Sequence, residues 1–175
     1  MQARRGQPFI LDANVLIDYC NSDLSVLETL SRRIGQVYIG KPTVDEVDQL
    51  TLREARKRGF TAVVPKLEIG LHAARKRGGL SFSDRVTLLL ARENSWCCIT
   101  SEKELRRECV KEGVSVLWGL EPMKILVANG AITPAKAVKT ARLIQASNPA
   151  FITAEIISKF EKQIAQIAKQ LPSKR

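Results

Sequence analysis

The sequence predicts an α/β fold in which a central, mostly parallel sheet is flanked by helices and followed by a helical C-terminal extension. Short apolar runs of strand type alternate with helical patterns from Phe9 to Leu117, and such alternation is typical of a parallel sheet with helices on both faces. After Trp118 only helical periodicity remains. With 175 residues, 45% of them hydrophobic, the chain can bury one substantial core. We therefore expect one domain over residues 1–118, with a helical extension packed on it over residues 119–175.

The elements expected in the first 118 residues follow from the apolar pattern. The expected strands, of which the third is only a candidate, are Phe9–Leu11, Val37–Ile39, Ala62–Val64, Trp96–Ile99 and Val114–Leu117. The helices expected between them run from about Asn14, from Asp23 to Ile34, through Glu46 and Val47, over the basic segment Arg53–Arg58, from Lys66 to Arg77, from Ser83 to Asn94, and from Glu102 to Lys111.

The extension is expected to hold long helices. Thr133-Pro134 is an N-cap followed by a first-turn residue, and Asn148-Pro149 is a second candidate for such a start. Apolar residues then recur at steps of three or four and mark one face of a long helix; they are Ile152, Ile156, Phe160, Ile164, Ile167 and Leu171. This stripe packs either on the core of the domain or on a partner, as a docking or dimer surface.

The chain is strongly basic, with 28 Lys and Arg against 18 Asp and Glu and a formal net charge of +10. The basic residues gather at Arg53–Arg58, Arg75–Arg77, Arg106-Arg107 and along Lys136, Lys139 and Arg142. Any one cluster can be a solvated helix face, but the excess over the whole chain fits a polyanionic partner. Because aromatic residues make up only 5% of the chain, we expect phosphate contacts to dominate over base stacking.

Several other classes of protein are disfavoured. No apolar run approaches the roughly 20 residues that span a membrane, and Met1–Gln7 is followed by no signal-type apolar region, so we expect a cytoplasmic protein. The four cysteines lack paired metal-ligand spacing and are expected to be reduced and structural. The lone histidine, His72, has no pairing signal with a Ser or Cys nucleophile.

Four carboxylates are candidates for a site: the first lies at the end of an apolar strand, and each of the other three is expected near the start of a helix, two of those helices following apolar strands. They are Asp12, Glu46, Asp84 and Glu102. Because strand ends in a parallel sheet share one edge, where open α/β sheets bind ligands, we expect these acids to converge. Two carboxylates about 5 Å apart repel by roughly 3 kcal/mol at an effective dielectric of about 20. Four in one pocket must therefore be protonated or hold a cation, and oxygen ligands alone suit Mg²⁺ or Mn²⁺. An acidic, metal-loaded pocket in a basic protein suits phosphodiester chemistry.

Each acid also has an ordinary structural role open to it. Thr43 to Glu46 and Ser81 to Asp84 match the capping box, in which the acid only satisfies backbone donors. Glu102 can complement a helix dipole, with Ser101 to Glu104 as the box. Asp12 can be a turn former.

Four segments, in this order and spacing, resemble the PIN domain over roughly residues 7 to 118. They are Leu11-Asp12-Ala13-Asn14-Val15-Leu16, Pro42 through Val44-Asp45-Glu46-Val47, Leu80-Ser81-Phe82-Ser83-Asp84, and Ile99-Thr100-Ser101-Glu102 through Leu105-Arg106. PIN domains are metal-dependent ribonucleases, and many are VapC-type toxins of VapBC-type toxin–antitoxin pairs. The resemblance implies a Mg²⁺- or Mn²⁺-dependent hydrolase that cuts RNA, a small antitoxin protein as partner, and a homodimer.

The resemblance also implies roles for particular residues. Asp12, Glu46, Asp84 and Glu102 are implied to be the catalytic, metal-binding acids, with Asn14 and Thr100 in supporting hydrogen-bond roles. The chain departs from the family pattern at Glu102, where an Asp is usual. In addition, the position of the basic segments between Glu46 and Asp84 predicts that Arg75, Lys76 and Arg77 border the pocket and bind RNA.

Two other functions stay open. An aspartyl-nucleophile phosphotransferase fits Asp12 at a strand end, but that chemistry usually needs a second acid two residues on, where this chain has Asn14. A non-catalytic module that keeps the fold and binds nucleic acid or a partner fits the basic surface and the departure at Glu102.

Overall fold

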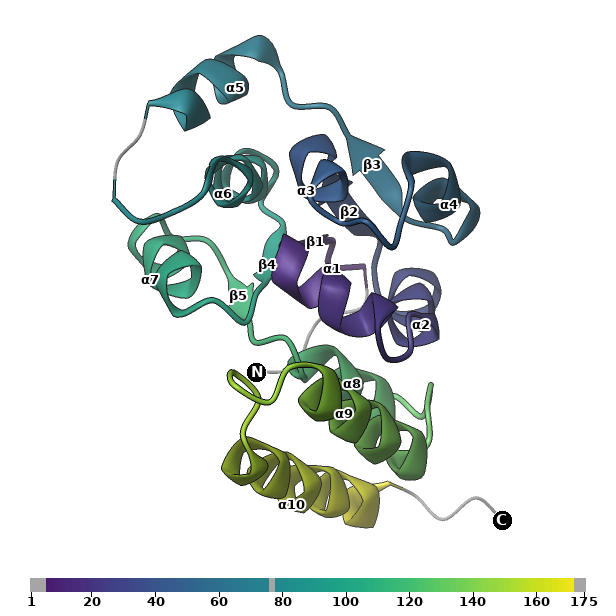
Figure 1. The fold of residues 1–175 in the computed structure, drawn as a ribbon. Coiled ribbons are helices and arrows are strands. Elements are labelled where there is room, and N and C mark those ends of the chain that lie inside the picture. Colours follow the sequence, from purple (N-terminus) through teal and green to yellow (C-terminus); the bar gives the residue numbers. More distant parts are fainter. Residues whose placement is uncertain (1–5, 76–77, 172–175) are drawn as a thin grey trace.

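The computed structural model describes residues 6–75 and 78–171, and its centre is a five-stranded, wholly parallel sheet in the order β3-β2-β1-β4-β5 (Figure 1). The strands are β1 (Phe9–Leu11), β2 (Val37–Gly40), β3 (Thr61–Val63), β4 (Cys97–Ile99) and β5 (Val116–Leu117). The predicted α/β class is confirmed, and the candidate strand at Ala62–Val64 is present with a shift of one residue. The strand expected at Val114–Leu117 is shorter, because only its last two residues pair with β4.

Strand β1 is the centre of the sheet and pairs with β2 on one side and β4 on the other. Leu11 lies opposite both Ile39 and Ile99, so β1 and β4 end at the same level and β2 ends one residue later. All residues of β1 are buried, as expected for a parallel strand covered on both faces. Asp12 and Thr100, which follow β1 and β4 directly, therefore lie beside each other at the carboxyl edge.

Ten helices are described around the sheet and beyond it. They are α1 (Ala13–Cys20), α2 (Ser25–Arg33), α3 (Lys41–Asp45), α4 (Leu52–Lys57), α5 (Leu67–Ala74), α6 (Phe82–Asn94), α7 (Lys103–Lys111), α8 (Glu121–Ala128), α9 (Pro134–Ser147) and α10 (Ala154–Gln170). The last residues of the helix expected from Lys66 to Arg77, residues 76 and 77, lie outside the described residues.

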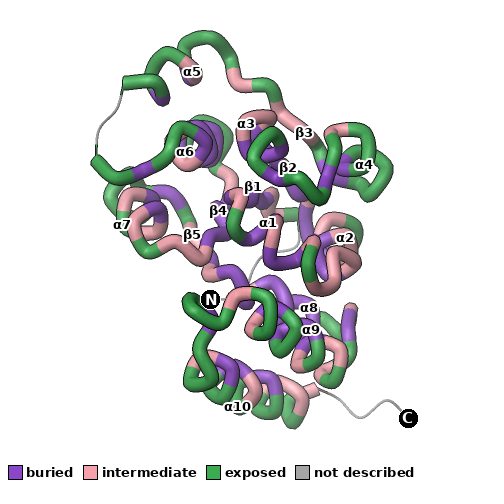
Figure 2. The backbone as a smooth tube through the Cα atoms, in the orientation of Figure 1, coloured by how far each residue is buried: buried purple, intermediate pink, exposed green. Residues whose placement is uncertain are grey.

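Two hydrophobic clusters cover the two faces of the sheet. Because side chains alternate along a strand, Phe9 and Leu11 pack into the cluster that includes α1, α2 and α8, whereas Ile10 packs into the one that includes α6 and α7. Figure 2 shows β1, β4 and the inner helix faces buried, with α4 and most of α5 exposed. The cysteines are free thiols, and Cys97, Cys98 and Cys109 are buried, in agreement with a structural role. No helix of the described residues is both long enough and apolar enough to cross a bilayer.

Two predicted helix starts are wrong, and a third helix starts within one residue of its predicted position but lacks the capping box considered for it. Helix α3 begins at Lys41 after the N-cap Gly40, because Pro42 fits the first turn, so Glu46 lies at the end of a helix. Helix α7 has Glu102 as its N-cap with no side-chain cap bond, so the box from Ser101 to Glu104 does not form. Asn148 ends α9, and the N-cap of α10 is Thr153.

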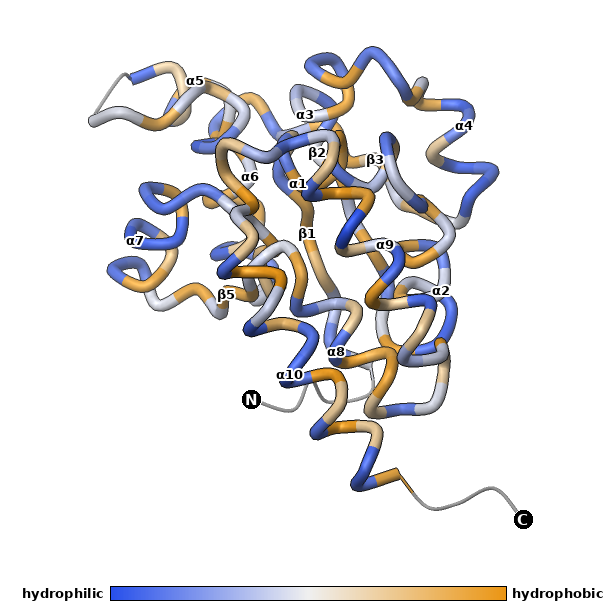
Figure 3. Tube along the Cα trace, turned by 60° about the horizontal axis from the view of Figure 1, so that its bottom comes forward, coloured by the Kyte–Doolittle hydropathy of each residue, from blue (hydrophilic) through white to orange (hydrophobic). Residues whose placement is uncertain are grey.

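The helical extension packs on the rest of the molecule through α8. Helix α10 lies on α8 and α9, and its stripe belongs to the same hydrophobic cluster as β1 and α1. Phe160 and Ile164 are 2% and 1% exposed, while the outer side of α10 is hydrophilic and alternates with the apolar side in Figure 3. Within this chain the stripe is thus core. The division at residue 118 stays a prediction.

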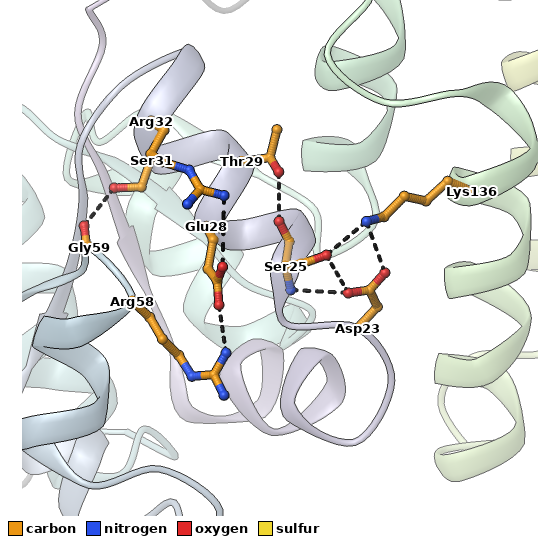
Figure 4. Close-up of polar contacts among 9 residues, drawn as sticks. All are labelled: Asp23, Ser25, Glu28, Thr29, Ser31, Arg32, Arg58, Gly59 and Lys136. Atoms are coloured by element: carbon orange, nitrogen blue, oxygen red, sulfur yellow. Dashed lines mark hydrogen bonds and ion pairs between the residues drawn. The ribbon is translucent and has the colours of Figure 1, made fainter.

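Polar contacts hold α2 between the extension and the edge of the sheet (Figure 4). Lys136 of α9 donates to Ser25 at 2.7 Å and pairs with Asp23 at 3.3 Å. On the other side, Arg58 pairs with Glu28 at 2.6 Å. Basic residues from two of the predicted clusters are therefore engaged inside the molecule.

Candidate active site

Asp12 occupies the carboxyl end of the central strand and caps the helix that follows. Its Oδ1 accepts a hydrogen bond from the backbone N–H of Val15 at 2.7 Å, and its Oδ2 accepts one from the hydroxyl of Thr100. The side chain is only 1% exposed. Burial, together with the negative charges of Asp84 and Glu102, raises the pKa of Asp12 to about 7, against the lowering effect of the two hydrogen bonds.

Thr100 connects Asp12 to Glu102. The Thr100 hydroxyl oxygen accepts a hydrogen bond from the backbone N–H of Glu102 at 2.9 Å while the same hydroxyl donates to Asp12. The Glu102 carboxylate accepts from the side-chain amide of Asn14 at 3.1 Å. Partial burial, then the charges of Asp84 and Glu104, raise the pKa of Glu102. Asn14 and Thr100 thus hydrogen-bond to two of the candidate acids, and the supporting roles that the resemblance implies for them stay a prediction.

Asp84 has both a structural role and an electrostatic one. Its carboxylate accepts from the backbone N–H and the hydroxyl of Ser81 at 3.0 and 2.8 Å, which forms the predicted capping box of α6. Its charge nevertheless raises the pKa values of Asp12 and Glu102. The structure therefore brings these three acids within electrostatic range of one another.

Glu46 joins this group through serine hydroxyls. It is exposed at the end of α3, and its carboxylate accepts from the hydroxyl of Ser83 at 2.6 Å. The Ser83 hydroxyl lies 2.9 Å from that of Ser81, which in turn contacts Asp84. Sequence reasoning gave Ser83 no role. Its position two residues after the N-cap Ser81, on the first turn that carries Asp84, is the signal that indicates one.

Among residues 6–75 and 78–171, no three His, Cys, Asp or Glu side chains are placed so that they could hold a metal ion together. The hydrogen bonds account for this arrangement, because Asp84 turns to its own capping box and Glu46 turns to Ser83. The donor set itself consists of carboxylate oxygens and suits a hard divalent cation. The electrostatic part of the predicted convergence is present for Asp12, Asp84 and Glu102, and the role of all four acids as ligands stays a prediction.

The site lies where the order of the strands in the sheet reverses. From β1 the chain proceeds to β2 on one side, whereas β4 pairs with β1 on the other. In open α/β sheets, ligands bind in the crevice at the carboxyl ends of the strands where the order reverses. Asp12 from β1 and Thr100 and Glu102 after β4 flank that crevice.

Two cavities adjoin these elements. One, of about 850 Å³, is lined by Asn14 and Glu102 of the acidic site, and also by Trp118 and Phe151. The other, of about 400 Å³, lies between α5, α6 and α7 and is lined by Arg75, but by none of the four candidate acids. Arg75 is exposed; Lys76 and Arg77, the other residues predicted to bind RNA, lie outside the described residues.

No protein family model matches this sequence, and no curated protein matches it. Among solved structures, the chain is similar to a PilT N-terminus domain protein from the hyperthermophilic archaeon Sulfolobus solfataricus P2. The TM-score is 0.52 and the identity is 13%, and the match covers 72% of this chain and 94% of that chain. At this identity the likeness concerns the fold. The chain has the fold of a PilT N-terminus, or PIN, domain.

Proposed function

We propose that this protein is a metal-dependent ribonuclease that hydrolyses RNA phosphodiester bonds with Mg²⁺ or Mn²⁺. The metal-binding acids in this proposal are Asp12, Glu46, Asp84 and Glu102. The observation that carries it is Asp12, a buried carboxylate at the carboxyl edge of a PIN-type sheet whose pKa is raised to about 7 by burial and by two neighbouring acids. Such an arrangement is costly without a cation and is typical of functional sites.

The side chains of the site have separable tasks in this proposal. Thr100 and the N–H of Val15 hold Asp12 in one orientation, and Asn14 does the same for Glu102. Asp84 and Glu46 complete the negative pocket from α6 and α3. When bound, a divalent cation supplies positive charge that stabilises the charge developing on the phosphate. The acids hold the cation beside a phosphate that their own negative charges would otherwise repel.

RNA is proposed as the substrate because the chain carries a formal charge of +10. Exposed basic residues attract the phosphate backbone whatever its sequence. Arg75, Lys76 and Arg77 are proposed backbone contacts that place the RNA.

The test is cleavage of an end-labelled RNA with added Mn²⁺ or Mg²⁺ and after chelation with EDTA. We expect EDTA to abolish cleavage by the wild type. Asp12→Asn should fold and leave the RNA intact in every condition. Asp48→Asn, which changes an exposed acid outside the site, should cleave as the wild type does. Cleavage by Asp12→Asn at the wild-type rate, or cleavage that persists in EDTA, would contradict the proposal.

A non-catalytic PIN-fold module that binds nucleic acid or a partner is the second candidate. It is favoured by the hydrogen bonds that turn Asp84 and Glu46 toward serines and by the lack of a three-ligand set among the described residues. This candidate predicts RNA binding that responds to salt but not to EDTA, and no cleavage under any metal condition.

The proposal extends, on the resemblance alone, to the toxin of a VapBC-type toxin–antitoxin pair with a small antitoxin partner, a homodimeric state and a cytoplasmic location. Expression in a bacterial host tests the first of these. The wild type should arrest growth and Asp12→Asn should not. Equal growth with both proteins would count against a toxin.

A further inference from the structure

The groove that begins at Asn14 and Glu102 continues to two aromatic side chains from the C-terminal part of the chain. Its volume is about 850 Å³, and Trp118 and Phe151 line it together with Lys103 and Arg107. Trp118 follows β5 directly, and Phe151 lies in the loop between α9 and α10. An acidic site and an aromatic surface therefore open into the same space.

Phe151 is exposed although its loop is held in place. The side chain is 75% exposed, while its neighbour Ile152 is buried in the core at 1% exposure. The backbone N–H groups of both residues donate to the carbonyl of Asn148, at 3.3 and 2.9 Å. The Asn148 side chain in turn donates to the buried Asp18 of α1 at 3.0 Å. The exposed ring of Phe151 thus belongs to a turn that is held in place by hydrogen bonds.

Two basic residues, Lys103 and Arg107, line the groove, and so do two acidic ones, Glu102 and Glu104. A lining with this many charged groups suits a polar ligand such as a nucleic acid better than an apolar segment of protein. Lys103 is exposed, and the Arg107 side chain remains 60% exposed although it pairs with Glu104 and Glu108. Cations beside flat aromatic rings match the phosphates and bases of one strand. The other tryptophan, Trp96, stacks on Tyr38 with ring centroids 3.9 Å apart, so its ring is already partnered.

We propose that this groove binds one unpaired nucleobase of the RNA, stacked on Phe151 beside Trp118, with Lys103 and Arg107 on the adjoining phosphates. The inference rests on the proposed function and narrows the substrate to single-stranded RNA, because a base inside a duplex has both faces covered. The proposed site also assigns base stacking a larger contribution to RNA binding than the low aromatic content of the chain predicted.

Binding measured without metal tests this inference apart from cleavage. We would titrate a labelled single-stranded RNA of about twelve nucleotides, and a duplex of the same length, with protein in EDTA and follow fluorescence anisotropy. Phe151→Ala should weaken single-strand binding about 5- to 100-fold and leave duplex binding and the salt slope unchanged, because the phosphate contacts remain. Phe151→Tyr should restore the affinity. Val110→Ala, which removes an exposed apolar side chain of α7, is the matched control and should bind as the wild type does.

The outcomes separate the two proposals. Unchanged single-strand affinity of Phe151→Ala, or an equal loss for the duplex, overturns the nucleobase site even where the wild type cleaves RNA. A wild-type dimer that Phe151→Ala converts to a monomer also overturns it, because a second copy of the chain then occupies the groove. A specific loss of single-strand binding by Phe151→Ala supports the site, even if no metal restores cleavage and the ribonuclease proposal fails.

Discussion

Replacing Asp12 by Asn should stabilise the metal-free protein at alkaline pH and not at acidic pH. In the folded protein the pKa of Asp12 is about 7, against an ordinary value of 3.8. Between these two pH values the folded state binds the proton and the unfolded chain does not. Stability from this group is thus fully present below about pH 4 and is lost as the pH rises through about 7.

The magnitude follows from the same pKa difference. At about 1.4 kcal/mol for each tenfold change in proton affinity, the rise of the Asp12 pKa from 3.8 to about 7 corresponds to about 4 kcal/mol. Asn cannot ionise and avoids this cost. The Asn side chain still has an oxygen that accepts from the N–H of Val15. Its amide nitrogen, however, replaces the carboxylate oxygen that accepts from the Thr100 hydroxyl, and the loss of this hydrogen bond costs about 1 kcal/mol. We expect Asp12→Asn to be about 3 kcal/mol more stable than the wild type near pH 8, and slightly less stable near pH 4.

Urea unfolding in EDTA at a series of pH values measures this difference. The free energy of unfolding of the wild type should fall between about pH 4 and about pH 7 relative to that of Asp12→Asn, and the difference should change sign below about pH 5. Asp48→Asn should follow the wild type at every pH. If Asp12→Asn is instead less stable by about 1 kcal/mol throughout, Asp12 is an ordinary ionised N-cap and the reasoning is refuted.

Three further predictions use the same contacts. Mn²⁺ should raise the melting temperature of the wild type near pH 8 by mass action and leave that of Asp12→Asn unchanged; equal shifts would place the ion elsewhere. Thr100→Val removes a hydrogen bond that lowers the pKa of Asp12. In the same urea series, the midpoint of the pH range over which stability falls should therefore be higher for this variant than for the wild type. Phe160→Asp with Ile164→Asp buries two unpaired charges at positions 2% and 1% exposed and should unfold the protein, as circular dichroism would show; a folded double variant would contradict the packing of α10.

Much of the sheet could be predicted because its strands are nearly continuous apolar runs. Phe9–Leu11 and Cys97–Ile99 are buried on both faces, and burial of that kind leaves a clear local pattern. The helix starts were harder, since Ser or Thr three residues before an acid, and Asn before Pro, also occur at positions that are no helix N-cap. Pro42 and Gly40 set the start of α3, and the Thr43 to Glu46 pattern lies inside that helix and at its end.

The placement of one candidate acid at the edge of the sheet could be predicted from the sequence, but the contacts around it could not. The position of Asp12 after a buried strand indicated a carboxyl-edge acid. Its contact with Thr100, however, spans 88 residues and depends on the parallel pairing of β1 with β4. The turn of Glu46 toward Ser83 across 37 residues likewise depends on how α3 meets α6. Local sequence patterns do not indicate such long-range contacts.

The same long-range logic joins the C-terminal extension to the site. Helix α1 carries Asp12 at its N-cap and the buried Asp18 six residues later. Asp18 accepts the hydrogen bond from Asn148 that holds the Phe151 turn. One helix therefore fixes both the acid at the sheet edge and the aromatic ring beside the groove, and helices α8 to α10 hold α1 by packing on the same hydrophobic cluster. The extension is thus more than a cover for the core, because it sets where the proposed nucleobase lies relative to the acids.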